Sequence, residues 1–274
     1  MLPISSRTAE SLIRICQRLH STTSSASVSS IDAKEVEKFG DLSAEWSDEL
    51  GSFHALHSLN RVRVPWIVDN VQQSASSDAS RRRRLVDVGS GGGLLSIPLA
   101  RSGFDVTGID ATRQAVDAAR ASLLSAPLQR AGVADRLRFE HTSVEAFCQK
   151  AHNRSAFDAV VASEIVEHVA DLETFVRSLA ELARPGAPLF VTTINRTWLS
   201  KLAAIWLAEN VFKIVPEGVH DWEKFVTPSE LTAHFEKAGC RVQAVHGLMF
   251  HPIGNHWTWC ESTQCNYAML AVKK

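Results

Sequence analysis

The sequence predicts an α/β fold organised around a mostly parallel β-sheet. Short apolar segments of strand length alternate with amphipathic segments of helical length over most of the chain. A glycine-rich turn follows the first apolar segment, and an acidic residue ends the second. Alternation of this kind is typical of a doubly wound sheet with helices on both of its faces.

The first 30 residues differ in composition from the rest of the chain. Three arginines stand against a single acid, apolar residues recur between them, and a Ser/Thr-rich run follows over residues 21–30. This composition is typical of an organelle transit peptide, and the arginines favour mitochondria, although a disordered tail is the alternative. We therefore expect residues 1–30 to be a mitochondrial transit peptide.

Residues 31–80 predict an N-terminal helical lid followed by a linker. Apolar residues recur at helical spacing from Val36 to Trp46, with charged residues between them. Residues 72–80 are rich in Ser and Ala, and they lead into four consecutive arginines at residues 81–84. These arginines form either a solvated loop or a contact with anionic lipid.

A strand at residues 85–88 is followed by the sequence Gly-Ser-Gly-Gly-Gly at residues 89–93. The glycines permit backbone torsions and a close ligand approach that a Cβ atom would prevent. The helix that begins behind them offers free N–H groups. The second strand, residues 106–110, ends at Asp110, which is placed to accept hydrogen bonds from a ribose diol. The arrangement predicts a nucleotide-binding turn.

The spacing of the glycines favours S-adenosylmethionine (SAM) over a dinucleotide. Leu94 stands where the G-x-G-x-x-G fingerprint has its third glycine. Asp87, two residues before Gly89, would face an anionic pyrophosphate, whereas a cationic ligand without phosphate would suit it better. The pattern D-V-G-x-G-x-G resembles motif I of SAM-dependent methyltransferases. A nicotinamide dinucleotide, or a glycine turn without any ligand, is the alternative.

The rest of the chain supplies the remaining elements of the sheet. In order, the pattern predicts a helix at residues 113–126, strands at 137–140 and 157–162, a helix at 172–182, and strands at 188–193, 241–248 and 266–272. The loop between the last two strands is too short for a helical crossover, so these strands should pair antiparallel. Residues 81–274 are therefore expected to form one domain.

Composition excludes several classes of protein. The chain has 274 residues, 45% of them hydrophobic, and a net charge of -1, which gives no signal for nucleic-acid binding. Its five cysteines include no C-x-x-C pair, which argues against a disulfide framework and against a zinc ribbon.

A charged cluster follows the strand at residues 157–162, at the edge where open α/β sheets bind ligands. If this stretch is helical, Glu164, Glu167 and His168 lie at i, i+3 and i+4 and share one face. Oxygen-rich ligation favours magnesium or manganese, and the histidine leaves zinc or cobalt open. The alternative is that the glutamates stabilise a helix start and that His168 hydrogen-bonds the substrate.

An apolar insertion at about residues 196–228 separates two of the predicted strands. Residues 198–215 would span about 27 Å as a helix, but three charged residues within them argue against a transmembrane segment. The segment lies in a lipid interface, covers an apolar substrate, or packs on the protein's own core. His220 follows it and is a candidate general base.

Several segments together resemble the ubiquinone biosynthesis O-methyltransferases. They are F-H-A-L-H-S-L-N with Arg63, the glycine turn, G-I-D ending at Asp110, E-I-V-E-H at residues 164–168, T-I-N-R at 193–196 and P-E-G-V-H-D-W-E-K-F at 216–225. The match runs from about Ile31 to the C-terminus. The glycine turn occurs in many methyltransferases, whereas the last two segments are more particular to this family.

The resemblance implies the Rossmann-like fold of class I SAM-dependent methyltransferases, with a mostly parallel seven-stranded sheet and an antiparallel C-terminal hairpin. It also implies a set of ligand contacts: SAM contacts from Arg63, Gly89, Asp110 and Ser163, and a divalent metal ion, magnesium in this family, at Glu164, Glu167 and His168. Ser90 and Ser163 replace a Cys and a Met that bacterial relatives often have, so the resemblance specifies those two contacts less well.

The resemblance implies methyl transfer from SAM to a ring hydroxyl of polyprenylated dihydroxybenzoate and demethylubiquinol intermediates, with divalent-metal assistance. Such a protein is expected on the matrix side of the mitochondrial inner membrane, as a peripheral member of a multi-subunit coenzyme Q biosynthetic complex. His168 and His220 are the expected catalytic residues. Two alternatives are a non-catalytic SAM-binding scaffold in such a complex and an NAD-linked quinone reductase.

Overall fold

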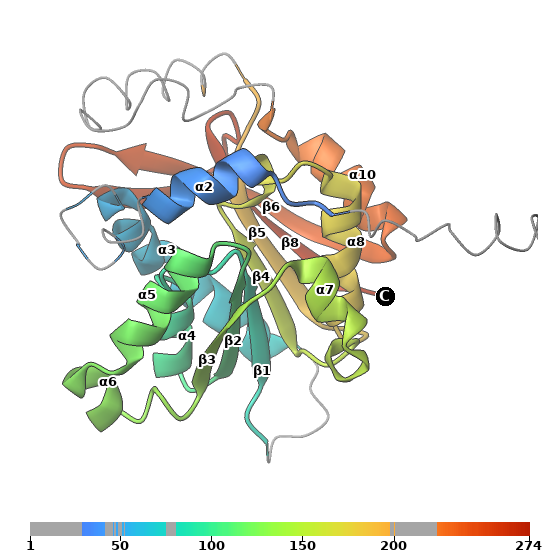
Figure 1. Cartoon of the computed structure of the whole chain (residues 1–274). Coiled ribbons are helices and arrows are strands. Elements are labelled where there is room, and N and C mark those ends of the chain that lie inside the picture. The colour runs from blue at the N-terminus through green and yellow to red at the C-terminus, as the bar shows by residue number, and fades with distance from the viewer. Residues whose placement is uncertain are drawn as a thin grey trace, which may run out of the picture.

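The computed structural model describes residues 29–41, 46, 48, 51, 53–74, 81–197, 200 and 224–274. At its centre is an eight-stranded sheet of order β3-β2-β1-β4-β5-β8-β6-β7 (Figure 1). The strands are β1 (Arg84–Val88), β2 (Asp105–Asp110), β3 (Leu137–His141), β4 (Ala159–Ser163), β5 (Pro188–Ile194), β6 (Cys240–His251), β7 (His256–Cys260) and β8 (Asn266–Lys273). The first five strands pair in parallel and the last three are antiparallel to their neighbours, which confirms the predicted fold class.

Helices cover both faces of the sheet, because the parallel strands are apolar on both sides. One face is covered by α3 (His54–Gln73), α4 (Ser96–Arg101) and α5 (Arg113–Leu123), which bury Ile67, Leu99 and Val116. The other is covered by α7 (Val144–Gln149), α8 (Leu172–Leu182) and α10 (Pro228–Lys237), which bury Phe147, Leu179 and Phe235. A short 3₁₀ turn, η2 (Ala151–Asn153), follows α7.

The helix predicted at residues 113–126 ends earlier, at Leu123, and a separate short helix, α6 (Ala126–Arg130), follows it. Pro127 lies in the first turn of α6, where its missing N–H costs nothing. The same proline cannot donate to the preceding turn, so α5 cannot continue through it.

The structure has one strand more than the seven that were expected. β7 pairs with the outer side of β6, and β8 pairs with the inner side, so the connection from β7 to β8 crosses over β6. Gly247 lies at the crossing, where a Cβ atom would come within 1.9 Å of the Ser262 carbonyl oxygen. The crossing therefore requires glycine at this position, a condition that strand periodicity does not reveal.

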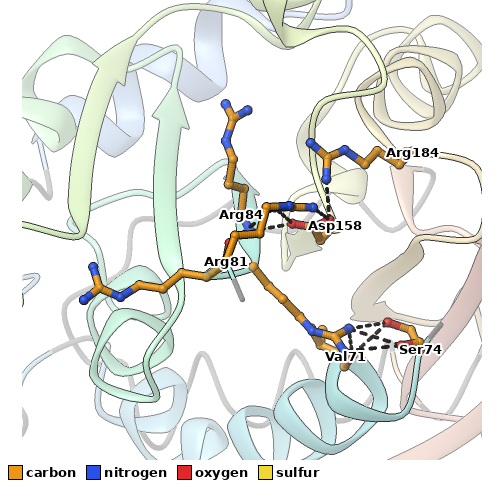
Figure 2. A network of polar contacts seen from close by, with 8 residues as sticks. Val71, Ser74, Arg81, Arg84, Asp158 and Arg184 are labelled. Atoms are coloured by element: carbon orange, nitrogen blue, oxygen red, sulfur yellow. Dashed lines mark hydrogen bonds and ion pairs between the residues drawn. The ribbon is translucent and has the colours of Figure 1, made fainter. Parts of the chain in front are cut away.

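Three of the four arginines at residues 81–84 have close partners at the amino edge of the sheet, and Figure 2 shows two of them, Arg81 and Arg84. Arg81 forms an ion pair with Asp158. Arg83 donates to carbonyl groups at the C-terminal end of α3, and the guanidinium of Arg84 lies 5.1 Å from the ring centre of Phe157. These contacts fasten β1 to α3 and to the start of β4, while the side chain of Arg82 is 63% exposed, as a solvated loop would have it.

The N-terminal segment lies across the carboxyl edge of the sheet (Figure 1). Ile31 forms an isolated bridge with Val169, and α2 (Ala33–Asp41) follows it. Ser30, although within the expected transit peptide, is buried and donates through its N–H and hydroxyl to Glu145. This position over the sheet is the one expected of a lid.

Parts of the expected organisation lie outside the described residues. They are residues 1–28 of the expected transit peptide, residues 42–45, 47, 49–50 and 52 of the lid, residues 75–80 of the linker, and residues 198–199 and 201–223 of the apolar insertion, which include His220. Within the part of the chain that is described, no helix has both the length and the apolar character needed to cross a membrane.

Candidate active site

A pocket lies at the carboxyl edge of the sheet, between the strand ends and the lid helix α2. Its walls come from the ends of β1 and β2, from the loops that follow β1, β2, β3 and β4, and from α2. Gly89, Asp110, Glu164 and His168, all predicted site residues, line it. The fold therefore brings together residues that are far apart in the sequence.

The glycine turn forms one wall of this pocket. Gly89 has a φ of 74°, and a Cβ atom on it would lie 2.7 Å from the side chain of Ile165. Both carboxylate oxygens of Asp110 accept backbone hydrogen bonds, from Gly91 N–H at 2.8 Å and from Thr112 N–H at 2.7 Å. Burial raises the pKa of Asp110. The carboxylate is thus held in place at the pocket by the two loops that it joins.

Arg63 reaches the same edge from α3 and is only 2% exposed. Its guanidinium donates to the Ser163 hydroxyl at 2.7 Å and to the Asn60 side-chain oxygen at 2.8 Å. Asp87 is equally buried and accepts from Ser96 at 2.6 Å. Burial raises the pKa of Asp87 to about 6, an effect that Ser96 and the charge of Arg63 only partly oppose. A positive and a negative charge therefore lie in the interior beneath the pocket.

The prediction of a helix that begins at Glu164 is wrong for its first turn. Glu164 has a φ of 54°, outside the helical range, and its N–H donates to the Thr192 carbonyl at 2.8 Å. Regular structure begins only at η3 (Val166–His168), a single 3₁₀ turn. The two glutamates therefore do not have the i, i+3 relation of an α-helix, because the chain first turns sharply away from β4.

The two glutamates nevertheless stay close enough to influence each other. Burial, and then the negative charge of Glu167, raise the pKa of Glu164 to about 7. Glu167 is 3% exposed and accepts a hydrogen bond of 2.7 Å from the Thr193 hydroxyl. Arg63 already places one positive charge near Glu164, and a bound cation beside both glutamates would further relieve the repulsion between them.

His168 has a partner that the sequence does not predict. Its Nδ1 lies 3.0 Å from Glu35 Oε2 on the lid helix. The ring of Phe39 packs edge-on against the imidazole, with ring centres 5.0 Å apart. Sequence reasoning missed Glu35 because it precedes His168 by 133 residues and is one of several acids in α2.

A metal ion fits part of this arrangement. Among the residues that the structure describes, no group of three or more Asp, Glu, His or Cys side chains has the spacing of a metal site. The donor chemistry of Glu164 and Glu167, two carboxylates that repel each other, suits a divalent cation. The predicted third ligand, His168, is held by Glu35 instead.

An aromatic cover lies over the glycine turn. Trp46 packs so closely on it that a Cβ atom on Gly92 would lie 2.3 Å from the tryptophan side chain. Trp46 stacks in turn on Phe53, with ring centres 3.9 Å apart. The lid is also tied to the far end of the insertion, since Lys224 pairs with Asp32 at 2.8 Å and with Glu35 at 3.4 Å.

Comparisons with known proteins agree with this geometry. The family model described as a methyltransferase domain matches residues 56–245. The chain is 40% identical over 260 residues to the ubiquinone biosynthesis O-methyltransferase, mitochondrial, of Homo sapiens, a match that covers 93% of this chain and 68% of that protein. It is 38% identical over 248 residues to the ubiquinone biosynthesis O-methyltransferase of Sinorhizobium fredii, covering 89% of this chain and 96% of that one.

Solved structures of lower identity share the fold. Magnesium protoporphyrin IX methyltransferase from Synechocystis PCC 6803 with bound SAH has a TM-score of 0.54 at 17% identity, over 80% of this chain and 84% of that chain. The PH0226 protein of Pyrococcus horikoshii OT3 has a TM-score of 0.57 at 13% identity, over 86% and 99% of the two chains. These likenesses place the sheet among the class I methyltransferase folds.

Proposed function

The chain belongs to the ubiquinone biosynthesis O-methyltransferases, and from this premise we propose which of its residues bind SAM and move its methyl group. Family membership decides between the ligands that the glycine turn left open, since a methyltransferase takes its methyl group from SAM and has no use for a nicotinamide dinucleotide. It likewise favours an enzyme over a non-catalytic scaffold.

The observation that carries the SAM assignment is the fixed carboxylate of Asp110. Two backbone N–H groups hold its oxygens at the pocket, and each oxygen keeps a second lone pair for a ribose hydroxyl. Gly89, without a Cβ, lets a ligand approach the turn closely. Together they bind the nucleoside half of SAM.

The amino-acid half of SAM carries a carboxylate, an ammonium and a sulfonium. Arg63 is a buried cation of the site and binds the carboxylate of SAM. The Ser163 hydroxyl accepts a hydrogen bond from its guanidinium and holds it in place. Asp87 supplies a buried negative charge for the cationic groups. A ligand of mixed charge thus meets a site of mixed charge, which is the condition for binding without a net desolvation penalty.

A divalent cation, magnesium by family resemblance, would be held by Glu164 and Glu167, with His168 as the third predicted ligand. The repulsion between the two carboxylates supports this proposal. A phenol has an ordinary pKa of about 10, and a bound cation would lower it and so make the substrate oxygen a better nucleophile.

The acceptor is a polyprenylated ring with neighbouring hydroxyls, as in dihydroxybenzoate and demethylubiquinol intermediates. The ring oxygen attacks the methyl carbon of SAM in line with the carbon–sulfur bond, the new oxygen–carbon bond forms as the old bond breaks, and a base takes the phenolic proton. An anionic oxygen and a cationic sulfonium neutralise each other in this step, so an apolar, enclosed pocket favours it. His168 lines the pocket and is a base candidate; His220 is the second.

The protein works on the matrix side of the mitochondrial inner membrane, as a peripheral member of a coenzyme Q biosynthetic complex. The arginine-rich first 30 residues support a mitochondrial address, and the human relative is a mitochondrial protein by name. The apolar residues 198–215 give the prenyl tail or the lipid surface something to contact.

The role of the two glutamates is tested with Glu164→Gln and Glu167→Gln in the full chain. Each should reduce methyl transfer at least about a hundredfold while SAM affinity, measured by calorimetry, changes little. A chelator should have the same effect on the wild type, and added magnesium should reverse it. Full activity in both variants, or in chelated wild type, contradicts the metal proposal.

A further inference from the structure

Glu35 and His168 form a close pair that the family motifs do not include. His168 Nδ1 lies 3.0 Å from Glu35 Oε2, and the side chain of His168 is 10% exposed and that of Glu35 15%. One residue comes from the lid helix α2 and the other from η3, beyond the end of β4. Their contact therefore joins the cover of the pocket to one of its reactive side chains.

The surroundings hold both partners of this pair. Phe39 packs edge-on against the imidazole at 87°, which restricts rotation of the ring. On the other partner, Glu35 Oε1 lies 3.4 Å from Lys224, and Oε2 lies 3.8 Å from Lys38. A glutamate has an ordinary pKa of about 4.3, so with two lysines beside it Glu35 is a carboxylate at neutral pH.

An ionised carboxylate can only accept a hydrogen bond, so the imidazole must donate to it from Nδ1. In the neutral ring the proton then resides on Nδ1 and the lone pair on Nε2. His168 lines the pocket, and Nε2 is the ring nitrogen not engaged by Glu35. Carboxylates commonly fix histidines in this way in catalytic and metal sites.

We propose that Glu35 is a positioning residue for His168: it fixes the tautomer in which Nε2, with its lone pair, serves the pocket. This inference rests on the proposed function, because it supplies His168 with the form needed either to accept the phenolic proton or to ligate a cation. It does not depend on which of the two His168 does.

Glu35 belongs to α2, the helix that covers the pocket. α2 is held over the pocket by the bridge between Ile31 and Val169 and by the ion pair of Asp32 with Lys224. When α2 is in this position it covers the pocket and also presents Glu35 to His168. The same position of α2 therefore both covers the pocket and orients the imidazole of His168.

A matched control separates positioning from simple fastening of the lid. Asp32 lies one turn before Glu35 and also pairs with Lys224, at 2.8 Å, while its other carboxylate oxygen accepts from the Lys34 N–H. Asp32→Asn removes a fastening contact and leaves the Glu35–His168 pair. Glu35→Ala removes both, and Glu35→Gln keeps an oxygen that can accept from Nδ1.

The test is the tautomer of His168, read from imidazole nitrogen shifts in the full chain labelled with ¹⁵N-histidine. It is measured at about pH 9, above the ordinary histidine pKa of about 6.5, and His168→Gln assigns the signal. We expect the Nδ1–H form in wild type, in Asp32→Asn and in Glu35→Gln, and its loss in Glu35→Ala. An unchanged His168 tautomer in Glu35→Ala overturns the proposal.

Activity provides the second readout. Removal of such a carboxylate typically costs 10- to 100-fold, so kcat of Glu35→Ala should fall by about that factor, with KM for SAM within about threefold of wild type. Glu35→Gln should recover part of the loss. Equal kcat in Glu35→Ala and Asp32→Asn contradicts positioning. If wild type itself shows no methyl transfer, the proposed function fails, and the tautomer alone decides whether Glu35 positions His168.

Discussion

The acids at the two edges of the sheet differ in the positively charged partners that surround them. At the amino edge, Asp158 is 8% exposed, and each of its carboxylate oxygens accepts two hydrogen bonds. The donors are Arg81, Arg184 and the backbone N–H of Arg84 (Figure 2). At the carboxyl edge, two acids, Asp87 and Glu164, lie near the buried Arg63, and each has a further acid beside it, Asp110 near Asp87 and Glu167 near Glu164.

The difference separates a structural site from a binding site. At the amino edge two arginines and a backbone N–H fill the hydrogen-bonding positions of a single carboxylate, so the cluster fastens β1 to the start of β4 without a ligand. At the carboxyl edge negative charge is in excess, and burial raises the pKa of Asp87 to about 6 and that of Glu164 to about 7. Carboxylates kept in this condition are costly to the fold and are expected where a cationic ligand completes the site.

The largest effect should come from removing Asp158, the acid at the centre of the amino-edge cluster. Asp158→Ala leaves Arg81 and Arg184 without their common partner, and we expect the free energy of unfolding to fall by about 2–3 kcal/mol through the lost hydrogen bonds to a charged group. Urea denaturation of the full chain measures it. A loss below about 1 kcal/mol would show that the cluster is not the fastening that its hydrogen bonds indicate.

The corresponding change at the other edge should have the opposite sign. Asp87→Asn removes a buried charge but keeps an oxygen for Ser96, so at pH 8 the protein without ligand should gain about 2 kcal/mol of stability. Its affinity for SAM should fall about tenfold, because a charge facing the cationic groups is lost. Ser96→Ala, which keeps the charge, serves as the control and should show no gain. A destabilised Asp87→Asn would remove the contrast between the edges.

The pH dependence of stability sharpens the same comparison. In Asp87 and Glu164 the pKa of the folded state lies above its ordinary value, so the folded protein binds more protons than the unfolded chain between about pH 4 and 7. Stability is therefore lost as the pH rises through this window. Lowering the pH from 8 to 6 should raise the unfolding free energy of the ligand-free protein by about 1–2 kcal/mol, and saturating SAM should reduce this slope. Thermal or urea unfolding with increasing stability up to pH 8 would contradict it.

The smallest effect should come from Arg82, in the same arginine run. Its side chain is 63% exposed and lies 3.9 Å from Asp105, so Arg82→Ala should change the unfolding free energy by less than about 0.5 kcal/mol. Arg81→Ala, its neighbour, should cost clearly more in the same urea experiment. Equal effects would show that the run acts through its summed charge and not through individual partners.

Much of this site could be predicted from the sequence because its signals are local. The turn at residues 89–93 and the acid that ends β2 are short-range patterns with a steric and a hydrogen-bonding cause. They led to Gly89 and Asp110 directly, and parallel strand ends must share one edge. Arg63, by contrast, came only from the family resemblance, because nothing in α3 itself marks a buried arginine.

The rest depends on contacts that no local pattern contains. The spacing of Glu164 and Glu167 fits a helix, but the chain leaves β4 through a residue with positive φ. Glu35 is an ordinary acid of an amphipathic helix until the fold sets it against His168. β7 was not predicted because its position depends on a loop that crosses β6 at Gly247, so close to the backbone that no Cβ atom would fit there.

The measurement that bears most directly on the enzyme is methyl transfer by the full chain from labelled SAM to a short-tailed prenyl dihydroxybenzoate, with SAM affinity determined in parallel. Labelled product methylated on a ring oxygen, together with SAM bound at one site, is the expected result. A protein that binds no SAM, or that binds it and yields no methylated ring, would contradict the assignment of the carboxyl edge as the methyl-transfer site.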